Sequence, residues 1–197
     1  MNRRGFLVSG MASAAIFALP NVALALNESQ ASALVQKVVN DINKVIASGK
    51  SVSSMIRDFE KIFVKYADVP NIARSTLGVS ARSASKSQLN AYTKAFQGYL
   101  SRKYGKRFEE FKGGEIIIKD ARPLKRFYEV RTQAKLKGQS PFDVNFMVSD
   151  KTGRAKFFDM KIEGISLLVT EREEIGAMLD KRNGNIDLLI KDLKKSG

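Results

Sequence analysis

The residue types that carry most enzyme chemistry are absent from this chain or scattered along it. It contains no cysteine and no histidine, which excludes a thiol nucleophile, a disulfide, a histidine-dependent triad and a histidine-ligated metal. The carboxylates that remain, among them Glu109, Glu110, Glu171 and Glu174, lie in charge-mixed helical runs typical of solvated helix faces. A carboxylate hydrolase would need such groups in one cleft, and no spacing in the chain brings them together. We therefore predict a protein that is not an enzyme and uses no metal or cofactor.

Basic residues are in excess, with 34 Lys and Arg against 20 Asp and Glu and a formal net charge of +14. Two denser clusters are Arg102, Lys103, Lys106 and Arg107, and then Lys119, Arg122, Lys125 and Arg126. Such an excess usually indicates a nucleic-acid partner. An anionic membrane surface or an acidic partner protein fits better if the protein is exported, as its first residues indicate. Simple solubility is a third explanation, so we predict no nucleic-acid partner.

Residues 1–25 have the pattern of an export signal. Arg3 and Arg4 form a basic start, an apolar run covers residues 6–19, and residues 23–25 have the small-x-small form of a cleavage site. The Arg-Arg-Gly-Phe-Leu order resembles a twin-arginine signal, although Sec signals also contain arginine pairs. Cleavage after Ala25 would release residues 26–197 from the cytoplasm and lower the net charge from +14 to +12 by removing Arg3 and Arg4. The alternative is an uncleaved anchor, for which the apolar run is short.

The first part of the remaining chain has helical periodicity. Apolar residues recur every three or four positions in residues 28–46, 52–67 and 86–108, and again in residues 167–181 and 186–193. Asn27 with Gln30 and Ser85 with Gln88 have the spacing of capping boxes, and Gly78 is placed to end a short helix. These signals predict helices at both ends of the domain.

The periodicity changes to that of β-strands after Gly114. Residues 115–119, 127–136, 142–148 and 155–162 have the pattern of four strands, and residues 150–153 form a hairpin turn that needs Gly153. Strands that follow one another through short turns pair antiparallel. We therefore predict one α+β domain over residues 26–197, in which a four-stranded antiparallel sheet is cupped by N- and C-terminal helices.

Two of these strands carry apolar side chains in both phases. Met147 is out of phase with its apolar neighbours in residues 142–148, and Phe157 is out of phase with Met160 and Ile162 in the next strand. A sheet that is covered on one side only does not need apolar residues on both faces. Either the second face is also covered, or the strands border an apolar cavity that suits a greasy ligand.

The segment Phe157-Phe158-Asp159-Met160-Lys161-Ile162-Glu163-Gly164-Ile165-Ser166-Leu167 resembles a conserved-looking block, D-x-x-I-E-G-V-S-L, of a known family. Asp68-Val69 and Thr76-Leu77-Gly78 resemble that family's "vDf … vLG" helix, and residues 187–193 resemble its closing helix. The family is MlaC, the periplasmic phospholipid-binding proteins also known as toluene-tolerance auxiliary proteins. The matching segments follow the family order over essentially all of residues 26–197.

The resemblance implies a monomeric, periplasmic phospholipid carrier with acyl tails in an apolar lipid pocket and the headgroup near solvent. It implies partners in an outer-membrane lipoprotein–porin complex and an inner-membrane ABC transporter with an MCE-domain subunit. Such a shuttle maintains the lipid asymmetry of the outer membrane. A carrier of hopanoids or other hydrophobic solutes is an alternative within the family. A basic periplasmic adaptor with a dry core and no lipid cargo is an alternative outside it.

Apolar residues on elements that should face one another are the candidates for the pocket wall. They are Phe59, Phe63, Leu77, Phe96, Tyr99, Val130, Val144, Phe146, Phe157, Met160 and Ile162. On a flat strand, Phe157 would point away from the face that carries Met160 and Ile162, so such a strand cannot place all three in one pocket. We expect Gly164 to allow a turn from strand to helix and Ser166 to cap that helix.

Overall fold

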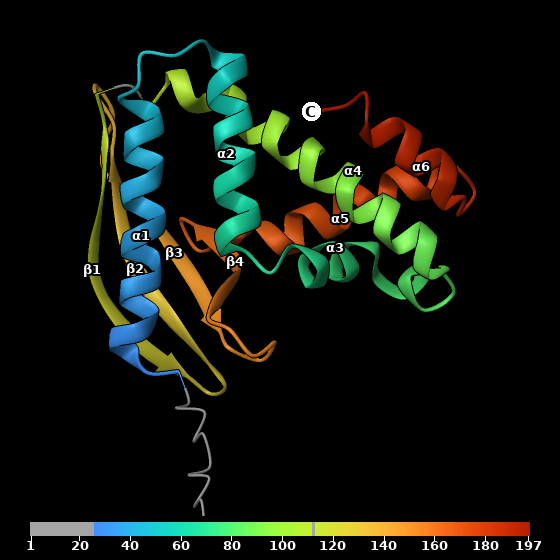
Figure 1. The fold of residues 1–197 in the computed structure, drawn as a ribbon, viewed down its shortest axis with the longest axis horizontal. Helices are drawn as coiled ribbons and strands as arrows, with labels where there is room; N and C mark the ends of the chain where they lie inside the picture. The colour runs from blue at the N-terminus through green and yellow to red at the C-terminus, as the bar shows by residue number, and fades with distance from the viewer. Residues whose placement is uncertain (1–25, 112) are drawn as a thin grey trace, which may run out of the picture.

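The computed structural model describes residues 26–111 and 113–197 of the protein, and the predicted export signal in residues 1–25 lies outside them. Helices and an antiparallel sheet build the described part of the chain, in agreement with the predicted mixed architecture (Figure 1). The elements are α1 (Glu28–Ile46), α2 (Val52–Tyr66), α3 (Val69–Leu77), η1 (Gly78–Arg82), α4 (Lys86–Gly105), η2 (Lys106–Glu109), β1 (Glu115–Leu124), β2 (Phe127–Lys135), β3 (Phe142–Ser149), β4 (Lys156–Ile162), β5 (Ile165–Ser166), α5 (Leu167–Asp180) and α6 (Ile186–Leu193).

The sheet has five strands in the order β1-β2-β3-β4-β5, so the prediction of four strands was wrong. The additional strand, β5, has only two residues, which is too short for an alternating pattern to appear in the sequence. It pairs with β4 through a two-residue turn in which Glu163 and Gly164 both have positive φ, the pattern of a type I′ turn. Gly164 therefore serves a hairpin turn and not the predicted strand-to-helix turn. Ser166 does cap α5, because its side chain accepts a hydrogen bond from the Val169 amide.

Helix α1 covers one face of the sheet, lying across β1, β2 and β3 (Figure 1). Its apolar stripe is buried there at Ala31, Val35, Val38 and Val39. The predicted capping box, formed by Asn27 and Gln30, is present at its start and satisfies backbone amides of the first turn. The sheet and α1 thus form one packed layer pair, with apolar burial as its main driving force.

A bulge in β4 decides which side chains face α1 and α2. Met147 of β3 pairs with Asp159 and Val148 pairs with Phe157, so Phe158 is an extra residue in the ladder. The extra residue shifts the alternation by one position. Phe157 therefore lies on the same face as Met160, which pairs with Phe146. The conflict between the phases of Phe157 and Met160 in the sequence comes from this bulge. Met147 does lie on the opposite face, where it is only 2% exposed, so that face also holds a buried apolar side chain.

The remaining helices form a second block beside β4, in which α4 packs against α3 and α6 and α5 packs against α3 (Figure 1). Tyr92, Phe96, Ile175 and Leu189 are fully buried in it. Arg102 of α4 fixes the C-terminal segment, because its guanidinium donates to the Leu193 carbonyl at 2.6 Å and to the Ser196 carbonyl at 2.8 Å. None of the helices in the described residues is both long and apolar enough to cross a bilayer.

Candidate functional site

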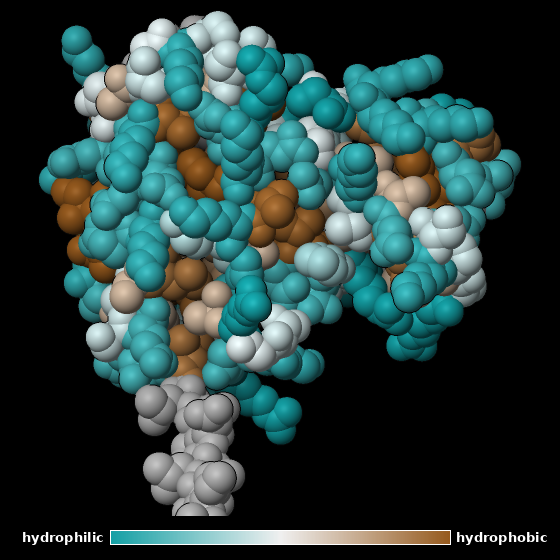
Figure 2. All heavy atoms as spheres, viewed as in Figure 1, coloured by the Kyte–Doolittle hydropathy of each residue, from teal (hydrophilic) through white to brown (hydrophobic). Residues whose placement is uncertain are grey.

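A cavity of about 160 Å³ lies where α1, α2, the end of α4, the start of α5 and strands β3 and β4 meet. Its wall is almost wholly apolar. Figure 2 shows hydrophobic residues reaching the surface along the seam between α1 and α2. The lining residues are Val38, Ile42, Phe59, Ile62, Phe63, Ile72, Leu100, Tyr104, Arg107, Phe111, Ile116, Phe142, Val144, Phe146, Phe157, Phe158, Asp159, Met160, Ile162, Leu167, Leu168 and Glu171.

The cavity brings together seven of the residues predicted for a pocket wall. They are Phe59 and Phe63 on α2, Val144 and Phe146 on β3, and Phe157, Met160 and Ile162 on β4. Phe157 is central to their packing. Its ring lies edge-on to Phe146 with centroids 5.6 Å apart, and 6.2 Å from the Phe63 ring. Aromatic contacts of this kind fix the wall beyond the effect of burial alone.

Leu77, Phe96, Tyr99 and Val130 are buried but do not border the cavity. Phe96 lies in the helical block, where its ring stacks on Tyr92 with centroids 5.8 Å apart. Val130 pairs with Phe146 on the inner face of the sheet, in the part that α1 covers. Helical spacing identifies the buried side of α4, but it does not tell which turns of a 20-residue helix reach the cavity. Only Leu100 and Tyr104, near the end of α4, do so.

The polar part of the wall, formed by Tyr104, Arg107, Asp159 and Glu171, was missing from the sequence prediction. Of these four, Glu171 was predicted to lie on a solvated helix face, and the other three were not considered as pocket residues. Glu171, however, is only 2% exposed, so the prediction of a solvated helix face was wrong for this residue. A local signal existed in the helical spacing, since Glu171 stands between the apolar residues Leu168 and Ile175 on the inner side of α5.

Glu171 belongs to a hydrogen-bonded cluster between α4 and α5. Its Oε1 accepts from Lys103 Nζ at 2.8 Å and from the Tyr104 hydroxyl at 2.5 Å. Lys103 also pairs with Glu174, whose Oε1 accepts from the Tyr99 hydroxyl at 2.7 Å. Burial, together with hydrogen bonds to carboxylates, raises the pKa of both tyrosines, so they stay protonated donors. Burial acts to raise the pKa of Glu174, but the bonds from Lys103 and Tyr99 outweigh it and lower that pKa.

The cluster joins α4 to α5 through ion pairs and hydrogen bonds. Within residues 26–111 and 113–197, no group of three or more acidic side chains is placed to hold a metal ion. Five of the eight cations in the two dense clusters of the sequence are also engaged in the fold. Lys103 pairs with Glu171, Arg107 with Glu110, Lys119 with Asp143 and Arg122 with Glu129, and Arg102 holds the C-terminal carbonyls. What the site offers chemically is an apolar interior.

Comparison with known proteins agrees with this fold. The family model described as "MlaC protein" matches residues 33–195. The chain belongs to the MlaC family. Among solved structures, the phospholipid-binding protein of Ralstonia solanacearum, determined in complex with a phospholipid, aligns with a TM-score of 0.72 and 20% sequence identity. The alignment covers 84% of this chain and 95% of that chain, so the two share the MlaC fold over almost their full length.

The MlaC motif near the C-terminus has a physical role in this site. Asp159 Oδ1 accepts from the Leu168 amide at 2.9 Å, and Asp159 Oδ2 accepts from the Ser166 hydroxyl at 2.7 Å. These bonds fasten the first turn of α5 to β4 and satisfy donors that the helix start leaves open. The motif thereby sets the angle at which Leu167 and Leu168 close one side of the cavity.

Proposed function

We propose that the protein is a periplasmic phospholipid carrier that holds acyl tails in the cavity between α1, α2, β3, β4 and α5. The observation that carries the proposal is the nearly uninterrupted apolar wall of this cavity in a chain of the MlaC family. The phospholipid bound by the Ralstonia solanacearum protein of the same fold supports it. The phase argument made from the sequence does not, because the bulge accounts for Phe157 and because Met147 lies on the opposite face of the sheet and does not line the cavity.

A lipid carrier is needed because the exposure of lipid tails to water is energetically unfavourable. Each buried methylene is worth about 0.8 kcal/mol, so a tail of about 16 carbons costs on the order of 10 kcal/mol to expose to water. A soluble apolar cavity offsets most of that cost while the lipid crosses an aqueous space. No nucleotide site is needed in the carrier itself, because a membrane partner can supply the energy.

The cavity has to widen when lipid enters. At about 160 Å³ it is close to the cavity of ~150 Å³ in another protein that holds one benzene molecule, and pockets for larger ligands usually measure ~300–1,000 Å³. We expect the wall to open along the seam between α1 and α2, where apolar side chains already reach the surface (Figure 2). Methionine and phenylalanine side chains can repack around tails of different shape.

The cellular role follows from the family and the export signal. We infer that the protein shuttles phospholipid between an outer-membrane lipoprotein–porin complex and an inner-membrane ABC transporter with an MCE-domain subunit. The export signal in residues 1–25 and the family's periplasmic location support this placement. The role would keep phospholipid out of the outer leaflet of the outer membrane.

Uptake from vesicles tests the proposal. The purified protein, residues 26–197, is mixed with vesicles of phosphatidylethanolamine and phosphatidylglycerol, separated from them, and its bound lipid is measured. A carrier takes up phospholipid in a saturable way and delivers it to acceptor vesicles. An adaptor with a dry core acquires no lipid, and that result would overturn the proposal.

A further inference from the structure

Glu171, which lines the cavity, has one carboxylate oxygen that makes no hydrogen bond within the described residues. Glu171 Oε1 accepts from both Lys103 and Tyr104, whereas Glu171 Oε2 is buried and finds no hydrogen-bond partner among the residues that the structure describes. Asn43 Oδ1 is another buried acceptor in that condition, but Asn43 does not border the cavity. Glu171 does border it, with a side chain that is 3% exposed.

A buried carboxylate oxygen without a partner is unfavourable, because the group has lost its hydration and gained nothing in return. Buried polar groups in native proteins are nearly always hydrogen-bonded, so this oxygen needs an explanation, such as a bound water, an ion or a ligand. The cluster around Glu171 also has one positive charge for two negative ones, since Lys103 is shared by Glu171 and Glu174. The free oxygen therefore presents an acceptor with partial negative charge to anything that enters the cavity.

Two other residues of the cavity wall indicate which part of a bound lipid would lie beside Glu171. Tyr104, at the end of α4, and Arg107, three residues later in η2, both border the cavity with Glu171. The Arg107 side chain is 63% exposed, so this section of the wall runs from a buried carboxylate to solvent. A polar group of a bound lipid, at the boundary between its tails and its headgroup, can therefore reach Glu171.

We propose that Glu171 Oε2 is a cargo-recognition site that accepts a hydrogen bond from an O–H or N–H group of the bound lipid. This inference rests on the proposed carrier function and narrows its substrate class to lipids that carry such a donor. The donor can come from a headgroup, such as an ethanolamine ammonium, or from a hydroxyl on the apolar body of the lipid. Lipids without a donor leave the oxygen unpaired and bind more weakly.

Matched ligand pairs test the inference and separate the two sources. Dioleoyl phosphatidylethanolamine is compared with dioleoyl phosphatidylcholine, which has the same tails but no N–H donor in its headgroup. Hexadecanol is compared with its methyl ether, which lacks only the O–H. Affinities are measured by displacement of a fluorescent fatty acid from the purified protein. We expect the donor member of at least one pair to bind about tenfold or more tightly, and the pair that responds identifies the source.

Three variants assign the preference to the proposed atom. Glu171→Leu removes the acceptor, and the preference should fall to near one. Glu171→Gln keeps a similar shape and an oxygen for Tyr104 but can turn an N–H₂ toward the cavity, so the preference should vanish or reverse. Glu174→Gln alters the same cluster without touching the cavity wall and should keep the preference. Thermal unfolding shows which variants are folded. If Glu171→Leu does not fold, Glu171→Gln alone is enough to test the inference.

The outcomes separate this inference from the carrier function. Tight binding of all four ligands with no preference in the wild type would overturn the inference and leave the carrier function standing. A preference that persists in Glu171→Gln would also overturn it. Binding of no ligand at all would overturn the carrier function and the inference together.

Discussion

At the scale of single residues, the cavity wall combines many interchangeable apolar side chains with a few that have defined tasks. Met160 is typical of the first kind. It is half-buried, it lines the cavity, and it pairs across the sheet with Phe146. Asp159 and Glu171 are of the second kind, because each makes hydrogen bonds that no apolar residue could replace. The two kinds predict different responses to substitution.

A charge placed at Met160 should expel lipid. The carboxylate of Met160→Glu would either keep its hydration and exclude the tails from the cavity, or lose its hydration when the tails enter. Either outcome makes the free energy of lipid binding less favourable by several kcal/mol. We expect phospholipid affinity to fall at least tenfold in a vesicle uptake assay. Met178→Glu is the matched control, since Met178 is also a half-buried methionine but does not line the cavity. Equal loss in both variants would contradict the assignment of the cavity.

The sequence was a good guide to apolar wall residues and a poor guide to polar ones. Phe59, Phe63 and Val144 could be predicted because hydrophobic periodicity marks residues that face inward. Glu171 was harder to predict, because its helical spacing was the one local signal and its partners Lys103 and Tyr104 stand on a distant helix. Burial of a charge is a property of the assembled packing, and local spacing holds little of that information.

At the scale of elements, two features shape the cavity: the bulge in β4 and the contact between α1 and α2. The bulge brings Phe157 and Met160 to one face, and no rule of strand alternation predicts where an extra residue is inserted. The helix caps at Asn27 and Ser85, by contrast, were predictable, because each box is formed by residues three positions apart. Long-range pairing decides the bulge, whereas local hydrogen bonds decide the caps.

Deletion of Phe158 should be tolerated better than deletion of a neighbouring residue. Without Phe158, Phe157 would still pair with Val148 and Asp159 with Met147, so the ladder becomes regular. Phe157, Met160 and Ile162 keep their cavity face, although the wall loses the Phe158 side chain. The protein should stay folded. Its free energy of unfolding should fall by about 1 kcal/mol, because the edge-to-face contact between Phe158 and Phe127 is lost. Deletion of Lys161 is the control, because it turns Ile162 to the outer face. Circular dichroism, thermal unfolding and lipid uptake report the result, and similar damage from both deletions would refute the bulge as the cause.

Asp41 links α1 to α2 and should limit how easily the seam opens. It accepts from the Tyr66 hydroxyl at 2.8 Å and from Lys65 Nζ at 3.1 Å. Asp41→Ala should cost about 1 kcal/mol of stability and speed the exchange of lipid with vesicles. Asp58→Ala is the matched control, since Asp58 pairs with Lys50 and Lys61 but does not reach α1. Exchange that is equally fast in both variants, or unchanged in Asp41→Ala, would contradict a gate between α1 and α2.

The same bonds give a pH dependence with a defined sign. The hydrogen bond from Tyr66, followed by that from Lys65, lowers the pKa of Asp41 below its ordinary value of 3.8. A carboxyl with a lowered pKa stabilises the folded state above its unfolded pKa and loses this effect as pH falls through the folded one. The stability difference between wild type and Asp41→Ala should therefore be constant near neutral pH and shrink below about pH 4. Urea unfolding at several pH values measures it, and a difference that grows in acid would be the wrong sign.

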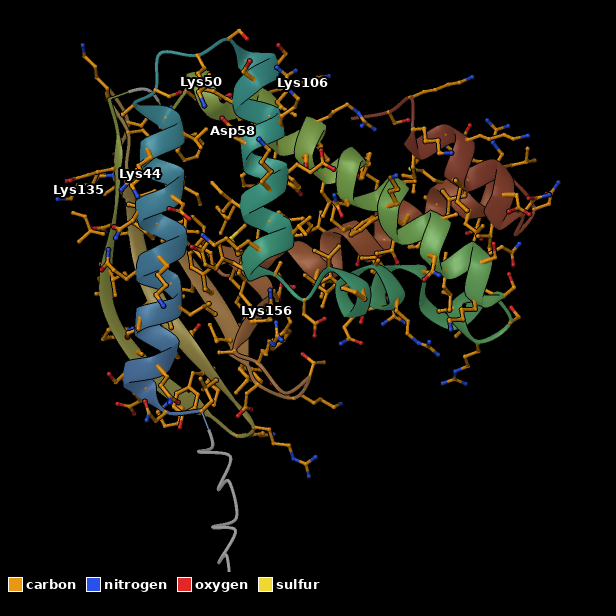
Figure 3. The ribbon with its side chains drawn as sticks, in the orientation of Figure 1. Lys44, Lys50, Asp58, Lys106, Lys135 and Lys156 are labelled. Carbon is orange, nitrogen blue, oxygen red and sulfur yellow. The ribbon has the colours of Figure 1, made fainter. Side chains whose placement is uncertain are left out.

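At the scale of the whole molecule, positive charge lies at the end of the seam. Figure 3 shows Lys44 and Lys135 near one end of α1, with Lys50 and Lys106 at the same end of α2 and Lys156 at the opposite end of α2. Much of this charge is balanced by ion pairs. Lys50 lies 2.6 Å from Asp58, Lys44 lies 3.6 Å from Asp41, and Lys135 lies 3.7 Å from Glu115. The excess over the chain is large, so we expect this end to approach anionic bilayers first.

Charge reversal at this end should slow delivery to anionic vesicles. Each lysine near an anionic surface contributes about 1 kcal/mol, so the loss of two lysines weakens vesicle association about 30-fold at low salt. Lys44→Glu combined with Lys106→Glu also adds two repelled charges, so it should weaken association by more than this. The difference should disappear in high salt, because screening removes it. Lys191→Glu with Lys194→Glu, on α6, is the control with the same change in net charge. An equal effect of both pairs would indicate that only the net charge matters.

The central claim is that this chain carries phospholipid in its cavity, and native mass spectrometry of the purified protein tests it most directly. The protein is isolated from bacterial cells without detergent and measured intact, and the bound mass is identified by fragmentation. We predict a complex of protein with phospholipid, which Met160→Glu loses and Met178→Glu keeps. A homogeneous protein without lipid, which takes up none from phospholipid vesicles, would contradict the account.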